Sequence, residues 1–249
     1  MADKRISELT ELVRPNGAVD IVPVMDTSTN KTKKALLSKL PISDSAVNHS
    51  FPFTTDITSN TATTQNLTSL SSSSGFNGST NLTSIYVGTA VTSIGSNTFT
   101  DCTSLIDVTL APGVTSIGDQ AFAFCTSMTS INIPESVISI GALAFQRCDS
   151  LASIVIPNSV TTITFSAFAT SKVVNLTIGA GVTSIGNQAF QNCTSLFTIN
   201  SLATSAPTLG TNVFGNIPAT QINVPAGATA SYKSAGDGTT YGGLTIVEV

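Results

Sequence analysis

Four cysteines are the residues of this chain whose type and spacing could do chemistry. Cys102, Cys125, Cys148 and Cys193 are separated by 23, 23 and 45 residues. Thiolates coordinate zinc and paired thiols form disulfides, so a metal site or a covalent bridge is conceivable. However, each cysteine lies three positions after a phenylalanine, once per copy of a sequence repeat. One cysteine per coil predicts a ladder of buried free thiols, which pack as small apolar groups.

Two other interpretations of the cysteines stay open. Neighbouring coils could bring Cys102 near Cys125, or Cys125 near Cys148, within disulfide reach. A metal site with four thiolate ligands fits less well, because Cys193 is two coils from Cys148 and Ser171 takes the equivalent position between them. We therefore expect neither a metal nor another cofactor.

No other group of residues points to catalysis. The single histidine, His49, lies among polar residues, which is typical of a solvated side chain. No Ser/His/Asp arrangement, paired-carboxylate motif or phosphate-binding glycine loop stands out. We expect that the protein is not an enzyme.

The charge distribution argues against nucleic acids and membranes as partners. The chain has 10 Lys and Arg against 14 Asp and Glu, and residues 1–40 contain seven of the basic residues. The remainder has too few basic side chains to neutralise phosphates, which dominates affinity for nucleic acids. No apolar run approaches the ~20 residues that span a bilayer, and the start MADKRISELTEL lacks the apolar core of a secretory signal. We expect no nucleic-acid binding, no membrane insertion and no secretory leader.

The elements that position these side chains belong to a repeat of 22–24 residues. Three successive copies are VTSIGSNTFTDCTSLIDVTLAPG, VTSIGDQAFAFCTSMTSINIPES and VISIGALAFQRCDSLASIVIPNS. About seven copies align over residues 67–227, the first at 67–90 and the others starting at Val91, Val114, Val137, Val160, Val182 and Ala206. Such a period predicts a solenoid, in which each unit buries its apolar face against its neighbours.

Apolar residues recur at equivalent positions of the copies. The phenylalanine column comprises Phe76, Phe99, Phe122, Phe145, Phe168, Phe190 and Phe214. An aliphatic column comprises Leu70, Ile94, Ile117, Ile140, Ile163, Ile185 and Leu209. The segment L-x-x-I-x-I adds apolar positions whose period-2 spacing predicts a short strand, with the intervening residue facing solvent. We expect these columns to form the core.

The copies resemble BspA-type leucine-rich repeats, whose units run roughly S-V-T-S-I-G-x-x-A-F-x-x-C-x-S-L-x-x-I-x-I-P. This resemblance implies a mainly β repeat solenoid with a parallel sheet built from the S-L-x-x-I-x-I-P strands. A second short strand near V-T-S-I-G, loops and short 3₁₀ turns would form the other side. The copies at 67–90, 160–181 and 206–227 depart from the pattern because they lack the cysteine.

The last residues break the period. A solenoid needs caps at its ends, because its terminal coils would otherwise expose the core. We expect a C-terminal cap at 228–249, with a short helix over 226–233 and a final strand over 244–249. In that strand Leu244 and Ile246 should share one face.

The outward residues of the predicted sheet form the candidate binding surface. The candidate partner-binding residues are Tyr86, Asp107, Thr109, Asn132, Asn175, Thr177, Asn200 and Asn223. Neutral hydrogen-bonding groups with an aromatic at one end predict binding of a glycan or a protein on a host surface. The alternative interpretation is a merely soluble face, because strand surfaces favour threonine in any case.

Residues 1–40 differ from the repeats. The motifs ISELTEL, DIVPVMD and TKKALLSKL follow one another and resemble the short N-terminal module of phage tail-fibre and related virion proteins. The resemblance implies a small α/β virion-attachment module that contacts other virion proteins, and a homo-oligomer, trimeric as in many fibres. The candidate attachment residues are Ile6, Leu9, Leu12, Val24 and Leu37. Residues 41–66, rich in Ser and Thr, are expected to be a linker.

Together these features predict a phage virion structural protein that is assembled in the host cytoplasm. It would be a tail fibre or surface fibre that displays the repeat domain for adhesion or host-receptor recognition. One alternative is a capsid decoration protein without a receptor role. Another is a cellular surface adhesin of the same repeat family, which would need a signal or an anchor. For residues 1–40 alone, the alternative is a simple cap on the solenoid.

Overall fold

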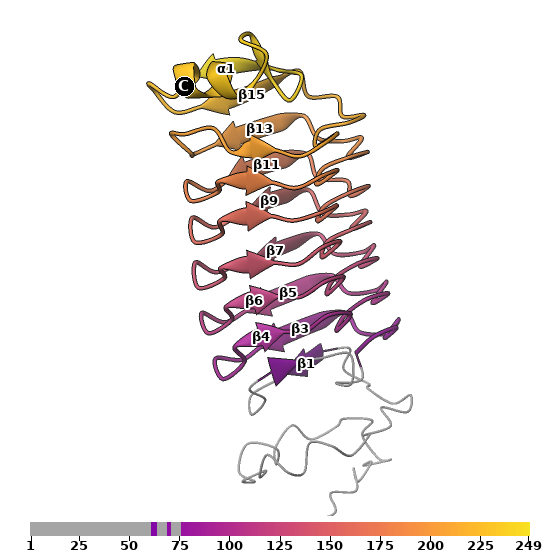
Figure 1. The fold of residues 1–249 in the computed structure, drawn as a ribbon. Helices are drawn as coiled ribbons and strands as arrows, with labels where there is room; N and C mark the ends of the chain where they lie inside the picture. Colours follow the sequence, from indigo (N-terminus) through magenta and orange to yellow (C-terminus); the bar gives the residue numbers. More distant parts are fainter. Residues whose placement is uncertain (1–60, 64–68, 71–75) are drawn as a thin grey trace, which may run out of the picture. The chain divides into compact units, whose positions relative to one another are not determined.

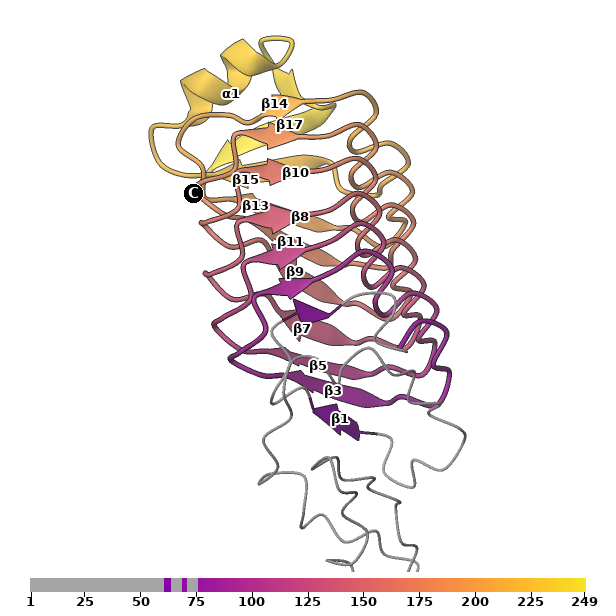
Figure 2. The same ribbon diagram turned by 60° about the horizontal axis from the view of Figure 1, so that its bottom comes forward.

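The computed structural model describes residues 61–63, 69–70 and 76–249 (Figure 1, Figure 2). The predicted attachment module at 1–40, with Ile6, Leu9, Leu12, Val24 and Leu37, lies outside the described residues. So do His49 and most of the expected linker.

The described part is the predicted mainly β solenoid, in which successive coils stack and equivalent strands lie side by side (Figure 1). One side carries β1 (Thr61–Thr63), β3 (Ser84–Val87), β5 (Asp107–Leu110), β7 (Ser130–Asn132), β9 (Ser153–Val155), β11 (Asn175–Ile178), β13 (Thr198–Ser201), β15 (Gln221–Val224) and β17 (Leu244–Glu248). The other side carries β2 (Ser69–Leu70), β4 (Ser93–Ile94), β6 (Ser116–Ile117), β8 (Ser139–Ile140), β10 (Thr162–Ile163), β12 (Ser184–Ile185) and β14 (Thr208–Leu209). The parallel sheet and the second short strand are therefore confirmed.

Parallel pairing keeps equivalent residues of neighbouring coils beside one another. In the register, Val108 of β5 lies between Ile85 of β3 and Ile131 of β7. The odd-numbered strands form two ladders, β1-β3-β5-β7 and β9-β11-β13-β15-β17, with an interruption between β7 and β9. At the interruption the Ala152 N–H still donates to the Thr129 carbonyl at 3.3 Å. The repeat length thus sets the register, and the register converts each sequence column into a row of contacts.

The phenylalanine column is the centre of the core. Neighbouring rings from Phe99 to Phe214 stack with centroids 5.1–5.8 Å apart and interplanar angles of 6–12°. Phe122, Phe145 and Phe168 have no exposed surface, and the aliphatic column packs around them. Offset stacking of this kind adds to the free energy gained from burial alone. The predicted core columns are confirmed.

The turns beside the phenylalanines differ from expectation, because the described coils contain hydrogen-bonded turns and no 3₁₀ helix there. The residues two positions before and two positions after each column phenylalanine from Phe99 to Phe214 have left-handed φ, between 50° and 62°. These residues are Asn97, Asp101, Gln120, Phe124, Leu143, Arg147, Ser166, Thr170, Gln188, Asn192, Asn212 and Asn216. A 3₁₀ turn requires successive residues with negative φ, so each left-handed residue ends it.

The chain after the repeats covers the last coil. Helix α1 (Thr229–Ala235) starts and ends slightly later than expected, and β17 adds a parallel strand to β15. Strand β16 (Thr240–Tyr241) pairs antiparallel with β17. The rings of Tyr232 and Tyr241 meet edge to face at 4.9 Å, and the Tyr232 hydroxyl lies 2.6 Å from Ser201 Oγ. Leu244 is buried and Ile246 packs against the core, so the two residues share the inward face as expected.

The odd-numbered strands extend past the predicted copies at both ends. Strand β1 pairs in parallel with β3 although it lies in the segment expected to be a linker. Strand β17 lies beyond the last copy. No helix in the described ranges has the length and hydropathy to cross a membrane.

Candidate binding face

The outward side of the odd-numbered strands β3 to β17, called here the strand face, contains the candidate binding residues. Along β5 the burial alternates, with Val108 and Leu110 buried and Asp107 and Thr109 exposed. All eight predicted partner-binding residues are exposed or half-buried, and none is in the core. Their outward position agrees with the strand periodicity, and their role in binding stays a prediction.

The register divides the candidate residues into two groups. Tyr86, Thr109 and Asn132 form one row across β3, β5 and β7. Thr177 of β11, Asn200 of β13 and Asn223 of β15 form another. Between the rows lies Val155 of β9, which is paired with Thr177 and is 58% exposed. Asp107 and Asn175 lie in the neighbouring column and do not meet, because β5 and β11 belong to separate ladders.

The two amides of the second group and the nearby Gln221 form one series of hydrogen bonds. Gln221 Nε2 donates to Asn223 Oδ1 at 3.4 Å, and Asn223 Nδ2 donates to Asn200 Oδ1 at 2.7 Å. Within the described part of the chain, the Nδ2 group of Asn200 donates to no protein acceptor. These hydrogen bonds orient the amides and leave the Nδ2 group of Asn200 available to a ligand. Ordered amides lose less conformational entropy when a ligand binds.

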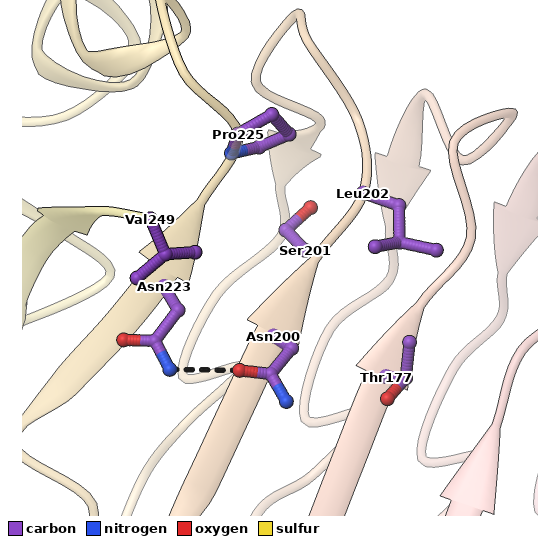
Figure 3. Close-up of a pocket in the computed structure, with 7 residues that line it drawn as sticks. All are labelled: Thr177, Asn200, Ser201, Leu202, Asn223, Pro225 and Val249. Carbon is purple, nitrogen blue, oxygen red and sulfur yellow. Dashed lines mark hydrogen bonds between the residues drawn. The ribbon is translucent and has the colours of Figure 1, made fainter.

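A shallow depression of about 400 Å³ lies beside these amides (Figure 3). It is lined by Thr177, Asn200, Ser201, Leu202, Asn223, Pro225 and Val249. In Figure 3 the two asparagines and Thr177 lie along the strands, and Leu202 and Pro225 lie beyond the strand ends. Three of the eight predicted residues therefore meet here, and they border an apolar rim.

An exposed aromatic ring lies at the opposite end of β13. Phe197 is 69% exposed and directly follows the buried Leu196. The N–H groups of both Phe197 and Thr198 donate to the Val174 carbonyl at 3.0 Å. Phe197 and Thr198 therefore both oppose Val174, as in a β-bulge. The side chains of Phe197 and Thr198 both lie outside the core. Phe197 and the partly exposed Val174 are neighbours on adjacent coils.

The strand face from β9 to β17 contains no charged side chain at its outward positions. These positions are Ser153, Val155, Asn175, Thr177, Thr198, Asn200, Gln221, Asn223, Thr245 and Val247. Glu248 at the end of β17 bonds to the Thr229 hydroxyl of α1, which holds the pKa of its carboxyl below the usual value. A ligand confined to these ten positions would therefore meet only neutral side chains.

The cysteines form the predicted buried ladder, and none of them is at an outward position of this face. Each thiol donates to the carbonyl of the column phenylalanine in the preceding coil, for example Cys125 to Phe99 at 3.2 Å and Cys148 to Phe122 at 3.3 Å. All four are free and buried. Burial raises the pKa of the Cys102 and Cys193 thiols to about 11, so at neutral pH they are protonated and poor nucleophiles. Among the residues that the structure describes, no three His, Cys, Asp or Glu side chains are placed to share a metal ion.

Sequence reasoning missed the apolar part of the site. Phe197, Leu202, Pro225 and Val249 were not among the candidate residues. One signal was available for Phe197: it is an aromatic residue outside the phenylalanine column, at a position occupied by Thr129, Ala152 and others in the remaining copies. Val249 had no such signal, because it joins the depression only through the pairing of β17 with β15.

Comparisons with known proteins agree with this architecture. A family model described as BspA type Leucine rich repeat region (6 copies) matches residues 41–136 and 115–235. No curated protein gave a match. A solved leucine-rich repeat protein from T. pallidum is similar with a TM-score of 0.56 and 25% identity, over 68% of this chain and 77% of that one.

Two further solved structures are similar at lower TM-scores. A leucine-rich cell surface protein from Faecalibacterium prausnitzii has a TM-score of 0.45 and 24% identity, over 76% of this chain and 69% of that one. A leucine-rich repeat protein from Eubacterium ventriosum has a TM-score of 0.47 and 24% identity, over 67% of this chain and 50% of that one. Since the family model spans well over half of the 249 residues, the chain belongs to the BspA-type leucine-rich repeat family.

Proposed function

We propose that this protein is a non-catalytic recognition module that binds its partner through the strand face from β9 to β17. The observation that carries this proposal is a strand face with neutral outward side chains, on which the oriented amides of Asn200 and Asn223 lie along the strands and the exposed Phe197 directly precedes β13. Leucine-rich repeat solenoids provide extended surfaces of this kind for binding. An exposed aromatic ring that the protein does not cover is a common feature of such sites.

The opposite side of the solenoid is less suited to recognition. Its outward threonines bond to the carbonyl groups of the neighbouring coil: Thr115 Oγ1 donates to Thr92 O at 2.9 Å, and Thr183 Oγ1 to Thr161 O at 3.1 Å. These hydrogen bonds stabilise the stacking of the coils. Each of these hydroxyl groups uses its single O–H donor within the protein and cannot donate it to a ligand. On the strand face, the Asn200 amide keeps a donor available.

A substitution that adds bulk and charge to the strand face tests this proposal. Thr177→Arg places a long cation in the middle of the second group, and Thr161→Arg makes the same change at an exposed position near β10. Binding of the labelled full chain to a panel of bacterial cells is measured for both. We expect Thr177→Arg to weaken binding at least tenfold and Thr161→Arg to leave it unchanged. Equal binding by the two variants would place recognition elsewhere.

The proposal includes attachment to a phage particle through residues 1–40. Its support is the order of ISELTEL, DIVPVMD and TKKALLSKL, which resembles virion attachment modules, followed by a charge-poor repeat domain. In this arrangement the protein is a tail fibre or surface fibre, homo-oligomeric through its small N-terminal module, with host-surface molecules as its partners. Apolar contacts of Ile6, Leu9, Leu12, Val24 and Leu37 join it to other virion proteins.

Deletion of residues 1–40 tests the attachment role. We expect the shortened chain to keep the circular dichroism spectrum and melting temperature of the solenoid and to be absent from purified particles. Normal incorporation would refute the attachment role. Immunogold labelling of intact particles then separates the two virion roles, because a tail location favours receptor binding and a capsid location favours decoration. A folded protein found on cells and never on particles would favour the surface adhesin.

A further inference from the structure

We infer that the ligand of the strand face is an uncharged saccharide, held between the ring of Phe197 and the amides of Asn175 and Asn200. This inference rests on the proposed function and narrows it to one class of ligand.

Phe197 has the exposure and position of a residue that stacks against a sugar ring. A phenylalanine that is 69% exposed leaves most of its apolar surface in water, so a ligand that covers the ring gains the free energy of burying that surface. The C–H face of a pyranose ring is flat and apolar, so it fits an aromatic face and gains the same burial. Val174 on the adjacent coil extends the apolar surface beside the ring.

The amides supply hydrogen bonds suited to hydroxyl groups. A sugar hydroxyl both donates and accepts, and an asparagine side chain offers a carbonyl oxygen and two N–H donors. The hydrogen bonds from Gln221 to Asn223 and from Asn223 to Asn200 orient the Asn200 amide and leave its Nδ2 group available. Asn175 Nδ2 lies 3.4 Å from Ser153 Oγ. Because the protein itself orients these groups, a ligand bears less of the entropic cost.

The dimensions suit a short oligosaccharide. Phe197 and Asn200 are three residues apart on an extended chain, about 10 Å at roughly 3.3 Å per residue. The adjoining depression of about 400 Å³ is within the range of roughly 300–1,000 Å³ for small-molecule sites. A ligand that stacks on Phe197 can therefore reach the depression by lying along β13.

Charge and patch size favour this ligand over two other classes. A sialylated or sulfated glycan would find no cation at the outward positions of β9 to β17, and a desolvated anion without a partner is costly. A protein interface typically buries about 800 Å² per partner around a contiguous apolar core. Here the exposed Phe197 and Leu202 are separated by the polar Asn200.

The test uses an array of neutral oligosaccharides of hexoses and N-acetylhexosamines beside sialylated and sulfated ones. The full chain is compared with Phe197→Ala, Asn200→Ala and the matched control Phe165→Ala, whose ring is 47% exposed in the turn after β10. We expect binding to at least one neutral glycan, with affinity at least tenfold lower for Phe197→Ala and Asn200→Ala and unchanged for Phe165→Ala. Circular dichroism melting of all variants confirms that they are folded.

Three results would overturn the inference. These are binding to charged glycans only, binding to a neutral glycan that Phe197→Ala leaves intact, and no glycan binding at all. If glycan binding is absent while Thr177→Arg still weakens cell binding, the saccharide is wrong and the recognition role stands. If no glycan binds and Thr177→Arg also leaves cell binding unchanged, both the saccharide and the proposed recognition role are wrong.

Discussion

Replacing Phe145 by alanine tests whether the ring column stabilises the solenoid. Phe145 has no exposed surface and stacks on both sides, with centroids 5.4 Å from Phe122 and 5.1 Å from Phe168 and interplanar angles of 7° and 6°. The substitution removes the ring from the middle of the stack and leaves a cavity lined by the two neighbouring rings.

The expected loss of stability lies at the upper end for such a change. Phe→Ala in a core costs about 3–5 kcal/mol, with larger values where the surroundings cannot collapse into the cavity. Collapse is limited here, because backbone hydrogen bonds hold the three coils at fixed spacing: Phe122 N–H to Ala144 O at 2.8 Å and Phe145 N–H to Ala167 O at 2.7 Å. Two ring contacts, each worth about 0.5–1.5 kcal/mol, are lost together. We therefore expect about 4–5 kcal/mol.

The measurement combines urea unfolding with hydrogen exchange. A solenoid can unfold in sections, so the exchange of individual amides shows whether protection falls most in the coils around β8 and β10. Phe165→Ala is the control, and we expect its unfolding free energy to change by less than about 0.5 kcal/mol because the ring is half exposed. A loss below about 1 kcal/mol for Phe145→Ala, or one equal to the control, would refute the buried column as a source of stability.

Two further predictions concern the turns and the thiols. Thr170 is β-branched and has φ 60°, whereas Asn192 and Asn216 occupy the equivalent left-handed position in later coils; because asparagine tolerates this conformation, Thr170→Asn should raise the free energy of unfolding by about 0.5–1 kcal/mol. Urea midpoints measure the gain, Asn192→Thr should show the reverse, and an unchanged midpoint in both would contradict the strain. Burial raises the pKa of Cys102 and Cys193 from 9.0 to about 11, so the unfolded chain loses these protons first as pH rises. The contribution of these two thiols to the free energy of unfolding is therefore complete below about pH 9 and lost between pH 9 and 11. At pH 8 a thiol reagent should label the native protein only as fast as the structure around the cysteines opens. Immediate labelling of the native chain would contradict this.

The repeat made the core predictable from the sequence. A residue that recurs with a period of 22–24 positions meets its own equivalents in neighbouring coils, so the environment of Phe122 could be inferred from the letters around Phe99 and Phe145. The same reasoning explained the cysteines, because Cys125 and Cys148 occupy one buried row. Period-2 spacing within each copy placed Thr109 and Asn200 outward.

Features that depend on a single coil were not predictable in this way. Strand β1 lies in a Ser/Thr-rich segment without a clear copy of the repeat, and its pairing with β3 supplies the structure that local composition does not indicate. The left-handed φ of Thr170 contradicts the preference of a β-branched residue. The backbone pattern imposed by the other coils overrides that preference.

The sequence by itself determined which residues form the scaffold, because an apolar residue type that recurs at the repeat period occupies the same buried position in each coil. It also determined that the outward columns of the sheet carry neutral polar groups. Only the tertiary structure decided which of those outward residues act together. Asn200 and Asn223 are 23 positions apart and form one hydrogen bond at 2.7 Å. Val249, outside the repeats, reaches the same depression through the pairing of β17 with β15. Which residues of neighbouring coils lie close together follows from the register of their strands. The register of β17 is set by the folded cap, whose sequence does not repeat, so it could not be predicted from the period.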